Sequence, residues 1–168
     1  MPRLFDAVSH TVVVRPERAD HPQVAALLEA LDVYLGSLYA PEANHILDVQ
    51  ALLAPDVHFV AAWQGSMAVG CGAVRIMPGE PDTAGEPYGE IKRMFVHPAS
   101  RGQGIGDRLI SALEDALKLR QVPQALLETG GEQHAALRLY ERAGYARRGP
   151  FGGYPDNGLS VFYGKRLG

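Results

Sequence analysis

Residues 96–113 read VHPASRGQGIGDRLISAL and carry the strongest structural signal in the chain. The run just before, 90–96, is β-capable and stops at Pro98, while an amphipathic helix is predicted from Gly104 to about Arg120. Glycines concentrated between strand and helix cost conformational entropy, so something must approach the backbone there. Successive N–H groups in such a turn, with the positive end of the helix dipole, can cradle a diphosphate. The stretch therefore predicts an anion-binding strand–turn–helix unit.

Other uses of a glycine-rich turn are weighed against this one. Its glycines, Gly102, Gly104 and Gly106, do not have the G-x-G-x-x-G spacing of dinucleotide-binding turns. The Gly-Lys-Ser/Thr of a Walker-type loop is also absent from the sequence. A tight connection that binds nothing stays open on the turn alone.

Hydrophobic spacing extends the prediction in both directions. Strands are expected at 11–15, 57–63, 67–77, 90–96 and 125–128, with two more after Gly144. Helices are expected at 22–38, capped by Asp20, and at 44–53, 104–120 and 132–143. Within 90–96, alternation puts Ile91, Arg93 and Phe95 on the side opposite to Glu90, Lys92, Met94 and Val96. The order of elements predicts an α/β (mixed α+β) fold, with one sheet of antiparallel and parallel parts covered by helices.

Composition narrows the classes of function. With 168 residues, 46% of them hydrophobic, the chain is expected to form one domain over 1–168. A net charge of -3 argues against nucleic-acid and anionic-membrane surfaces, and no apolar run is long enough to span a bilayer. Cys71 is the single cysteine, which excludes an internal disulfide and a thiolate cluster, so no metal site is expected. A cytoplasmic location is the working expectation.

Two motifs together resemble a known family. Arg101-Gly102-Gln103-Gly104-Ile105-Gly106, preceded by Val96-His97-Pro98, is similar to the R/Q-x-x-G-x-G/A acetyl-CoA signature of the GCN5-related N-acetyltransferases, or GNAT family. Residues 139–145, LYERAGY, resemble the family's second diagnostic stretch, one helix and one strand downstream. The resemblance is specific from Glu90 to Tyr145 and extends most weakly to a bacterial subgroup of small-molecule acetyltransferases. It implies a mostly antiparallel sheet of about seven strands flanked by about four helices.

The resemblance also assigns a cofactor site for acetyl-CoA. The main chain of Met94, Phe95 and Val96 would pair with the pantetheine arm like an additional strand. The amides of the turn would hold the pyrophosphate, which assigns Arg101, Gly102, Gln103, Gly104, Ile105 and Gly106. Gln133 stands where relatives often have an asparagine that contacts the cofactor. Asp107 departs from the pattern because a carboxylate repels phosphate, so it is expected to point away, with Arg108 compensating.

Direct acyl transfer to an amine needs a base for the amine and a proton for the departing thiolate. By family position, Tyr140 would protonate the sulfur of the coenzyme. Glu90, at the start of its strand, is the favoured base, and Glu128, at the end of the next strand, is the alternative. Packing of the Tyr140 ring and plain solvation of either carboxylate are the structural alternatives.

The acceptor is expected to be a primary amine on a small molecule. Tyr34, Tyr39, Phe151 and Tyr154 fall in regions that form acceptor pockets in this fold, and Arg93 with His97 could hold a carboxylate. Two other readings stay open: a protein or peptide acceptor, and a non-catalytic acyl-CoA sensor. A homodimer could form through residues 159–165 if they lie at a sheet edge, although that strand could equally be internal.

Overall fold

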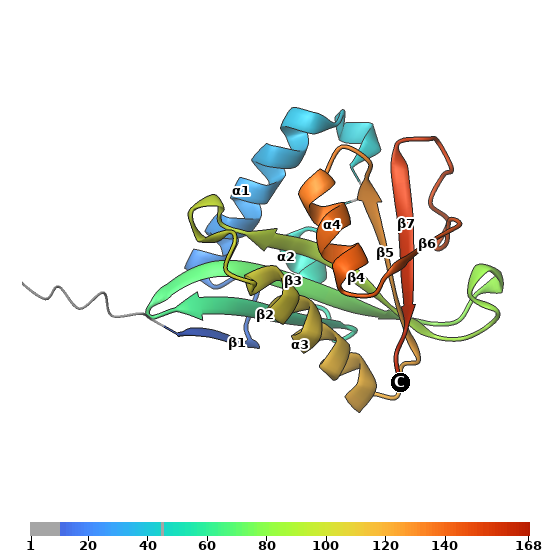
Figure 1. The fold of residues 1–168 in the computed structure, drawn as a ribbon, viewed down its shortest axis with the longest axis horizontal. Helices are drawn as coiled ribbons and strands as arrows, with labels where there is room; N and C mark the ends of the chain where they lie inside the picture. The colour runs from blue at the N-terminus through green and yellow to red at the C-terminus, as the bar shows by residue number, and fades with distance from the viewer. Residues whose placement is uncertain (1–10, 45) are drawn as a thin grey trace, which may run out of the picture.

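The computed structural model describes residues 11–44 and 46–168, whose strands form one seven-stranded sheet in the order β1-β2-β3-β4-β5-β7-β6 (Figure 1). The strands are β1 (Val12–Pro16), β2 (Val57–Gln64), β3 (Met67–Met77), β4 (Tyr88–Val96), β5 (Gln124–Gly130), β6 (Ala146–Arg148) and β7 (Ser160–Arg166). All neighbours pair antiparallel except β4 and β5, which are parallel. The predicted mixed, mostly antiparallel sheet is confirmed.

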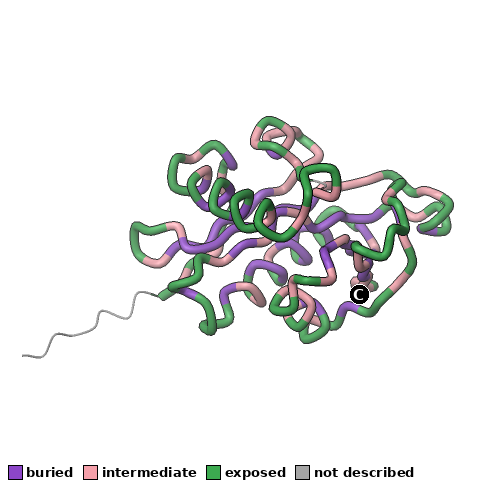
Figure 2. Tube along the Cα trace, turned by 90° about the horizontal axis from the view of Figure 1, so that it is seen from above, coloured by how far each residue is buried: buried purple, intermediate pink, exposed green. Residues whose placement is uncertain are grey.

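Four α-helices cover the sheet in the described part of the chain. They are α1 (Pro22–Leu38), α2 (Val49–Leu52), α3 (Ile105–Leu119) and α4 (His134–Arg142). Helices α1 and α2 lie on one face, and α3 and α4 lie on the other (Figure 1). Buried residues gather along the strands, while the outer sides of the helices are exposed (Figure 2). No helix in the described ranges is long and apolar enough to cross a bilayer.

Two details of the N-terminal helices differ from expectation. His21, not Asp20, caps α1: its Nδ1 accepts a hydrogen bond from the Gln23 N–H at 3.2 Å, while Asp20 pairs with Arg18. The second helix is a single turn because Asp48 starts it, accepting from the Ala51 N–H at 2.8 Å. The spacing of apolar residues predicted where the helices lie, but it did not identify which polar side chain caps the start of each helix.

A bulge in β4 breaks the predicted alternation. Arg93 has a positive φ of 59°, and the pairing of β3 with β4 shifts register at this point. Lys92 and Arg93 consequently both project toward the α1 face, whereas Met94 packs with the cluster under α3. The prediction that Arg93 and Lys92 face opposite sides was wrong because an inserted residue resets the two-residue period.

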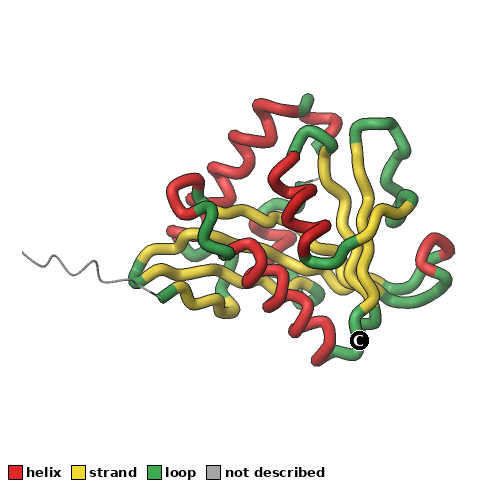
Figure 3. The backbone as a smooth tube through the Cα atoms, in the orientation of Figure 1, coloured by secondary structure: helices red, strands yellow, loops and turns green. Residues whose placement is uncertain are grey.

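The parallel pair β4 and β5 separates almost at once. Only Gly89 with Ala125 and Glu90 with Leu126 are in register, so the main chain of β4 beyond Glu90 has no partner from β5. Strand β7 lies between β5 and β6, so the internal alternative for 159–165 is the observed one. A long loop joins β6 to β7 (Figure 3). The opening between β4 and β5 is the feature that positions the site.

Candidate active site

A cleft of about 280 Å³ lies where β4, the glycine turn and α4 meet. The predicted cofactor residues on its wall are Met94, Phe95, Val96, Arg101, Gly102, Gly104, Ile105, Gly106 and Gln133. Gln103 is the one predicted cofactor residue that does not line it. The structure therefore brings together main chain from β4 and main chain from the turn on one concave surface.

The turn leaves its backbone open to this cleft. Gly102 and Gly104 have φ values of 80° and 74°, and a Cβ atom added to either would meet nothing within 4 Å. Gly104 begins α3, so the unpaired N–H groups of the first helical turn lie beside it. Arg101 donates from Nε to the Val96 carbonyl at 3.0 Å, which ties the turn back to β4. This geometry fits a bound diphosphate.

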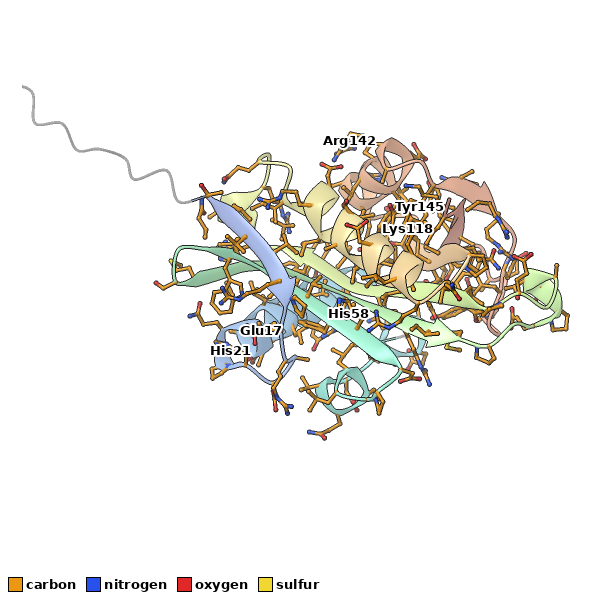
Figure 4. All side chains as sticks on the ribbon, turned by 90° about the horizontal axis from the view of Figure 1, so that it is seen from below. Glu17, His21, His58, Lys118, Arg142 and Tyr145 are labelled. Carbon is orange, nitrogen blue, oxygen red and sulfur yellow. The ribbon has the colours of Figure 1, made fainter. Side chains whose placement is uncertain are left out.

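Asp107 is among the residues that line the same cleft. Its carboxylate is paired with Arg142 of α4, at 3.2 Å to Nε and 3.1 Å to Nη2. Arg108, the expected partner, instead donates to the Val12 carbonyl. Arg142 lies where α3 and α4 come together (Figure 4) and also lines the cleft. The ion pair offsets the repulsion that a lone carboxylate would exert on phosphate.

A second cavity, of about 100 Å³, lies on the α1 side of the opening. It is formed by α1 and the segment after it, by residues 91–94 and 128–130, and by the start of β7. The residues shared by both cavities are Leu31, Met94, Gln133 and Tyr140. The two cavities therefore adjoin at these four residues.

Tyr140, which lines both cavities, is tightly packed. Its side chain is buried and packs against Tyr145 and Tyr163, with ring centroids 6.1 and 6.4 Å away. Its hydroxyl makes no hydrogen bond to another described residue. Burial, and then the negative charge of Glu128, raise the pKa of Tyr140. The phenol therefore keeps its proton at neutral pH.

The two candidate bases occupy different places. Glu128 lines the second cavity and accepts a hydrogen bond from Ser160 Oγ at 3.0 Å. Glu90 lines neither cavity. Its carboxylate accepts from Lys92 Nζ at 3.2 Å and from the Tyr154 hydroxyl, in a cluster beneath the cavity wall. Of the two carboxylates, only Glu128 lines one of these cavities.

The comparisons with known proteins agree with this geometry. The sequence profile described as "Acetyltransferase (GNAT) family" matches residues 24–145. An IAA acetyltransferase of Azospirillum brasilense is 45% identical over 93% of this chain and 98% of its own length. The chain belongs to the GNAT acetyltransferase family. A Klebsiella pneumoniae structure assigned as an acyl-CoA N-acyltransferase is 33% identical, has a TM-score of 0.74 and covers 94% of this chain and 99% of its own.

As a GNAT acetyltransferase, the protein is an enzyme that takes its acetyl group from acetyl-CoA. Arabidopsis thaliana NAA60, solved with acetyl-CoA, shares the fold at a TM-score of 0.65 and 18% identity, covering 94% of this chain and 99% of its own. Open space beside Gly102 and Gly104 fits the diphosphate of that molecule. From Met94 to Val96, β4 pairs with β3 but has no partner from β5, and this open side fits an extended, amide-bearing arm.

The other residues predicted to contact the acceptor do not all lie in one place in the acetyltransferase. Tyr39 lines the second cavity, whereas Tyr34 lines the cofactor cleft. Phe151 is fully buried, and the Tyr154 hydroxyl donates a hydrogen bond to Glu90. Neither residue lines the second cavity. His97 caps the turn that follows it, where its Nδ1 accepts from the Ala99 N–H at 3.1 Å.

Lys92 is a charged residue of the second cavity that was not predicted as a site residue. The predicted alternation had already grouped it with Glu90, a signal that an ion pair was within reach. Its ammonium is held by Tyr154, which comes from a distant loop, and the bulge brings Arg93 to the same side of β4. Neither the contact with Tyr154 nor the bulge at Arg93 can be recognised from the neighbouring sequence.

Proposed function

We propose that this acetyltransferase transfers the acetyl group directly to a primary amine of a small molecule. The observation that supports it is the meeting of two cavities beside Tyr140, at the opening between β4 and β5. Direct transfer, without an acyl-enzyme intermediate on cysteine, is favoured because the only cysteine, Cys71, cannot act as a nucleophile. That thiol is fully buried, and burial raises its pKa to about 12.

In this proposal each residue holds a molecule or moves a proton. The amides of Gly102 to Gly106 and the Arg101 side chain bind the diphosphate, and the β4 main chain at Met94 to Val96 aligns the thioester. Bound acetyl-CoA supplies an activated acyl group. Glu128 takes a proton from the acceptor amine, which frees the nitrogen lone pair, and Tyr140 gives a proton to the departing sulfur.

The small size of the second cavity favours a small acceptor over a polypeptide. Its volume of about 100 Å³ is below the roughly 300–1,000 Å³ of sites that enclose drug-sized ligands. A few heavy atoms beside the reacting amine would fill it. A peptide N-terminus would need a longer surface for its second and third residues.

A thiol-release assay over a panel of acceptors tests this proposal. The panel contains small primary amines, peptides with free N-termini, a lysine-rich protein and IAA, because the Azospirillum relative is named for it. Release of coenzyme A that depends on small amines is the expected result. Turnover with peptides or protein lysines alone would overturn the small-molecule assignment, and saturable acetyl-CoA binding without any turnover would favour the sensor alternative.

A further inference from the structure

The charged side chains on the acceptor cavity are unevenly distributed. Among the described residues that line it, the charged ones are Lys92, Arg93 and Glu128. The carboxylates that neutralise the two cations, Glu90 and Asp32, are not on the wall. A molecule in the cavity therefore meets one carboxylate and two cations, whose counter-charges lie behind them.

Lys92 retains a hydrogen-bonding group for a ligand. An ammonium has three N–H donors. Two of them are used, toward Glu90 Oε2 at 3.2 Å and Tyr154 Oη at 2.7 Å. The third has no partner in the described ranges, although the side chain is only 11% exposed. Glu90 and Tyr154 thus hold the ammonium in one place.

Arg93 adds a second, deeply buried positive charge beside it. Its side chain is 4% exposed and donates from Nη1 to Asp32 at 2.6 Å. Its Nε is buried without a hydrogen-bond partner among the described residues, which is uncommon for a charged group. Asp32 itself is half exposed, so solvent weakens its compensation of the buried guanidinium.

We propose that the acceptor is an amino acid, in the broad sense of a small molecule with a carboxylate besides its amine. Lys92 binds the acceptor carboxylate, Arg93 strengthens the positive field behind it, and Glu128 receives the amine. Resting on the proposed function, this assignment names the acceptor class for the same cavity. Lys92 is then a specificity-determining residue, and Glu90 and Tyr154 are positioning residues.

Paired acceptors provide the test. Each pair is an amino acid and the amine left by its decarboxylation, such as alanine with ethylamine and leucine with isoamylamine, and β- and γ-amino acids vary the spacing. Lys92→Met removes the ammonium and keeps the stem. The double variant Lys92→Met/Glu90→Gln avoids leaving a buried carboxylate unpaired. Lys118→Met, on the exposed end of α3, is the control.

The expected wild-type result is a preference of about tenfold or more in kcat/KM for at least one amino acid over its decarboxylated partner, as for a charge-assisted hydrogen bond. Both Lys92 variants are expected to lose that preference, and Lys118→Met to keep it. Equal use of both members, preference for the plain amine or a diamine, or an unchanged ratio in the Lys92 variants overturns the inference and leaves the proposed function standing. Failure with every small amine overturns the proposed function instead.

Discussion

The Tyr140 phenol and the Glu128 carboxylate share the wall of one cavity, and the negative charge of Glu128 adds to burial in raising the pKa of Tyr140. The negative charge of Glu128 therefore favours the neutral form of the Tyr140 phenol. A neutral phenol can give a proton, and a carboxylate that is not protonated can take one. Tyr140 comes from α4 and Glu128 from β5, so the pair exists only in the folded chain.

Tyr140→Phe is expected to lower kcat by about 10²-fold, the scale of general acid catalysis, with little change in acetyl-CoA affinity. Because its raised pKa keeps Tyr140 protonated, wild-type kcat should show no loss from its ionisation below about pH 10. Steady-state kinetics and calorimetry measure both. Tyr145→Phe is the matched control: its hydroxyl donates to Glu114 at 2.8 Å outside both cavities, so stability should fall and kcat should hold. Equal loss of kcat in both variants would mean that removal of a buried tyrosine hydroxyl disturbs the fold, and would remove the support for Tyr140 as the proton donor.

Glu128→Gln is expected to lower kcat/KM by about 10²-fold or more, because the amide cannot accept a proton from the amine. The Gln side chain keeps an oxygen that can accept from Ser160, so the fold should be retained. Glu90→Gln is the companion variant: its kcat should stay within a few fold of wild type because Glu90 lines neither cavity, while the KM for an acceptor that carries a carboxylate should rise because Glu90 positions Lys92. A larger loss in Glu90→Gln than in Glu128→Gln would return the role of base to Glu90, acting through water.

Gly130→Ala is expected to obstruct the acceptor cavity without affecting the cofactor cleft. A Cβ at this position would lie 1.8 Å from the Tyr39 hydroxyl, so the Tyr39 ring must move. KM for the acceptor should rise several-fold, while the Kd for coenzyme A stays unchanged. Gly131→Ala controls for the chain position, because its Cβ would meet only Val161 and Leu159 atoms at 3.7 and 3.8 Å. Identical kinetics for the two variants would contradict the placement of the acceptor beside Tyr39.

Gly104→Ala is expected to weaken coenzyme A binding by about tenfold, the scale of one hydrogen bond to a charged group. A side chain at a φ of 74° strains the turn by roughly 1–2 kcal/mol, and its methyl group would enter the space assigned to the diphosphate. Gly85→Ala carries the same backbone penalty, at a φ of 75° with no atom within 4 Å, in a loop away from the cleft. Calorimetry that finds equal affinities in both variants would remove the turn from the binding site.

The sequence predicted the order of the elements because most of them are bounded by proline, glycine or a clear change of period. Helix α1 and strand β3 have the expected ends, and Gly144 takes the left-handed cap conformation with a φ of 95°. The glycine turn could be assigned to a cofactor because its chemistry is local. The placement of Glu90 could not be foreseen, because Tyr154 reaches it from a loop more than sixty residues away and the bulge at Arg93 has no pattern of its own.

We propose that the main chain of β4 and the glycine turn bind acetyl-CoA at the opening between β4 and β5. Hydrogen–deuterium exchange with saturating coenzyme A measures this directly. Slower exchange is predicted for amides in 91–106 and at the start of α4, with α2 and the loop joining β6 to β7 unchanged. Saturation of the protein without protection in 91–106 would contradict the claim.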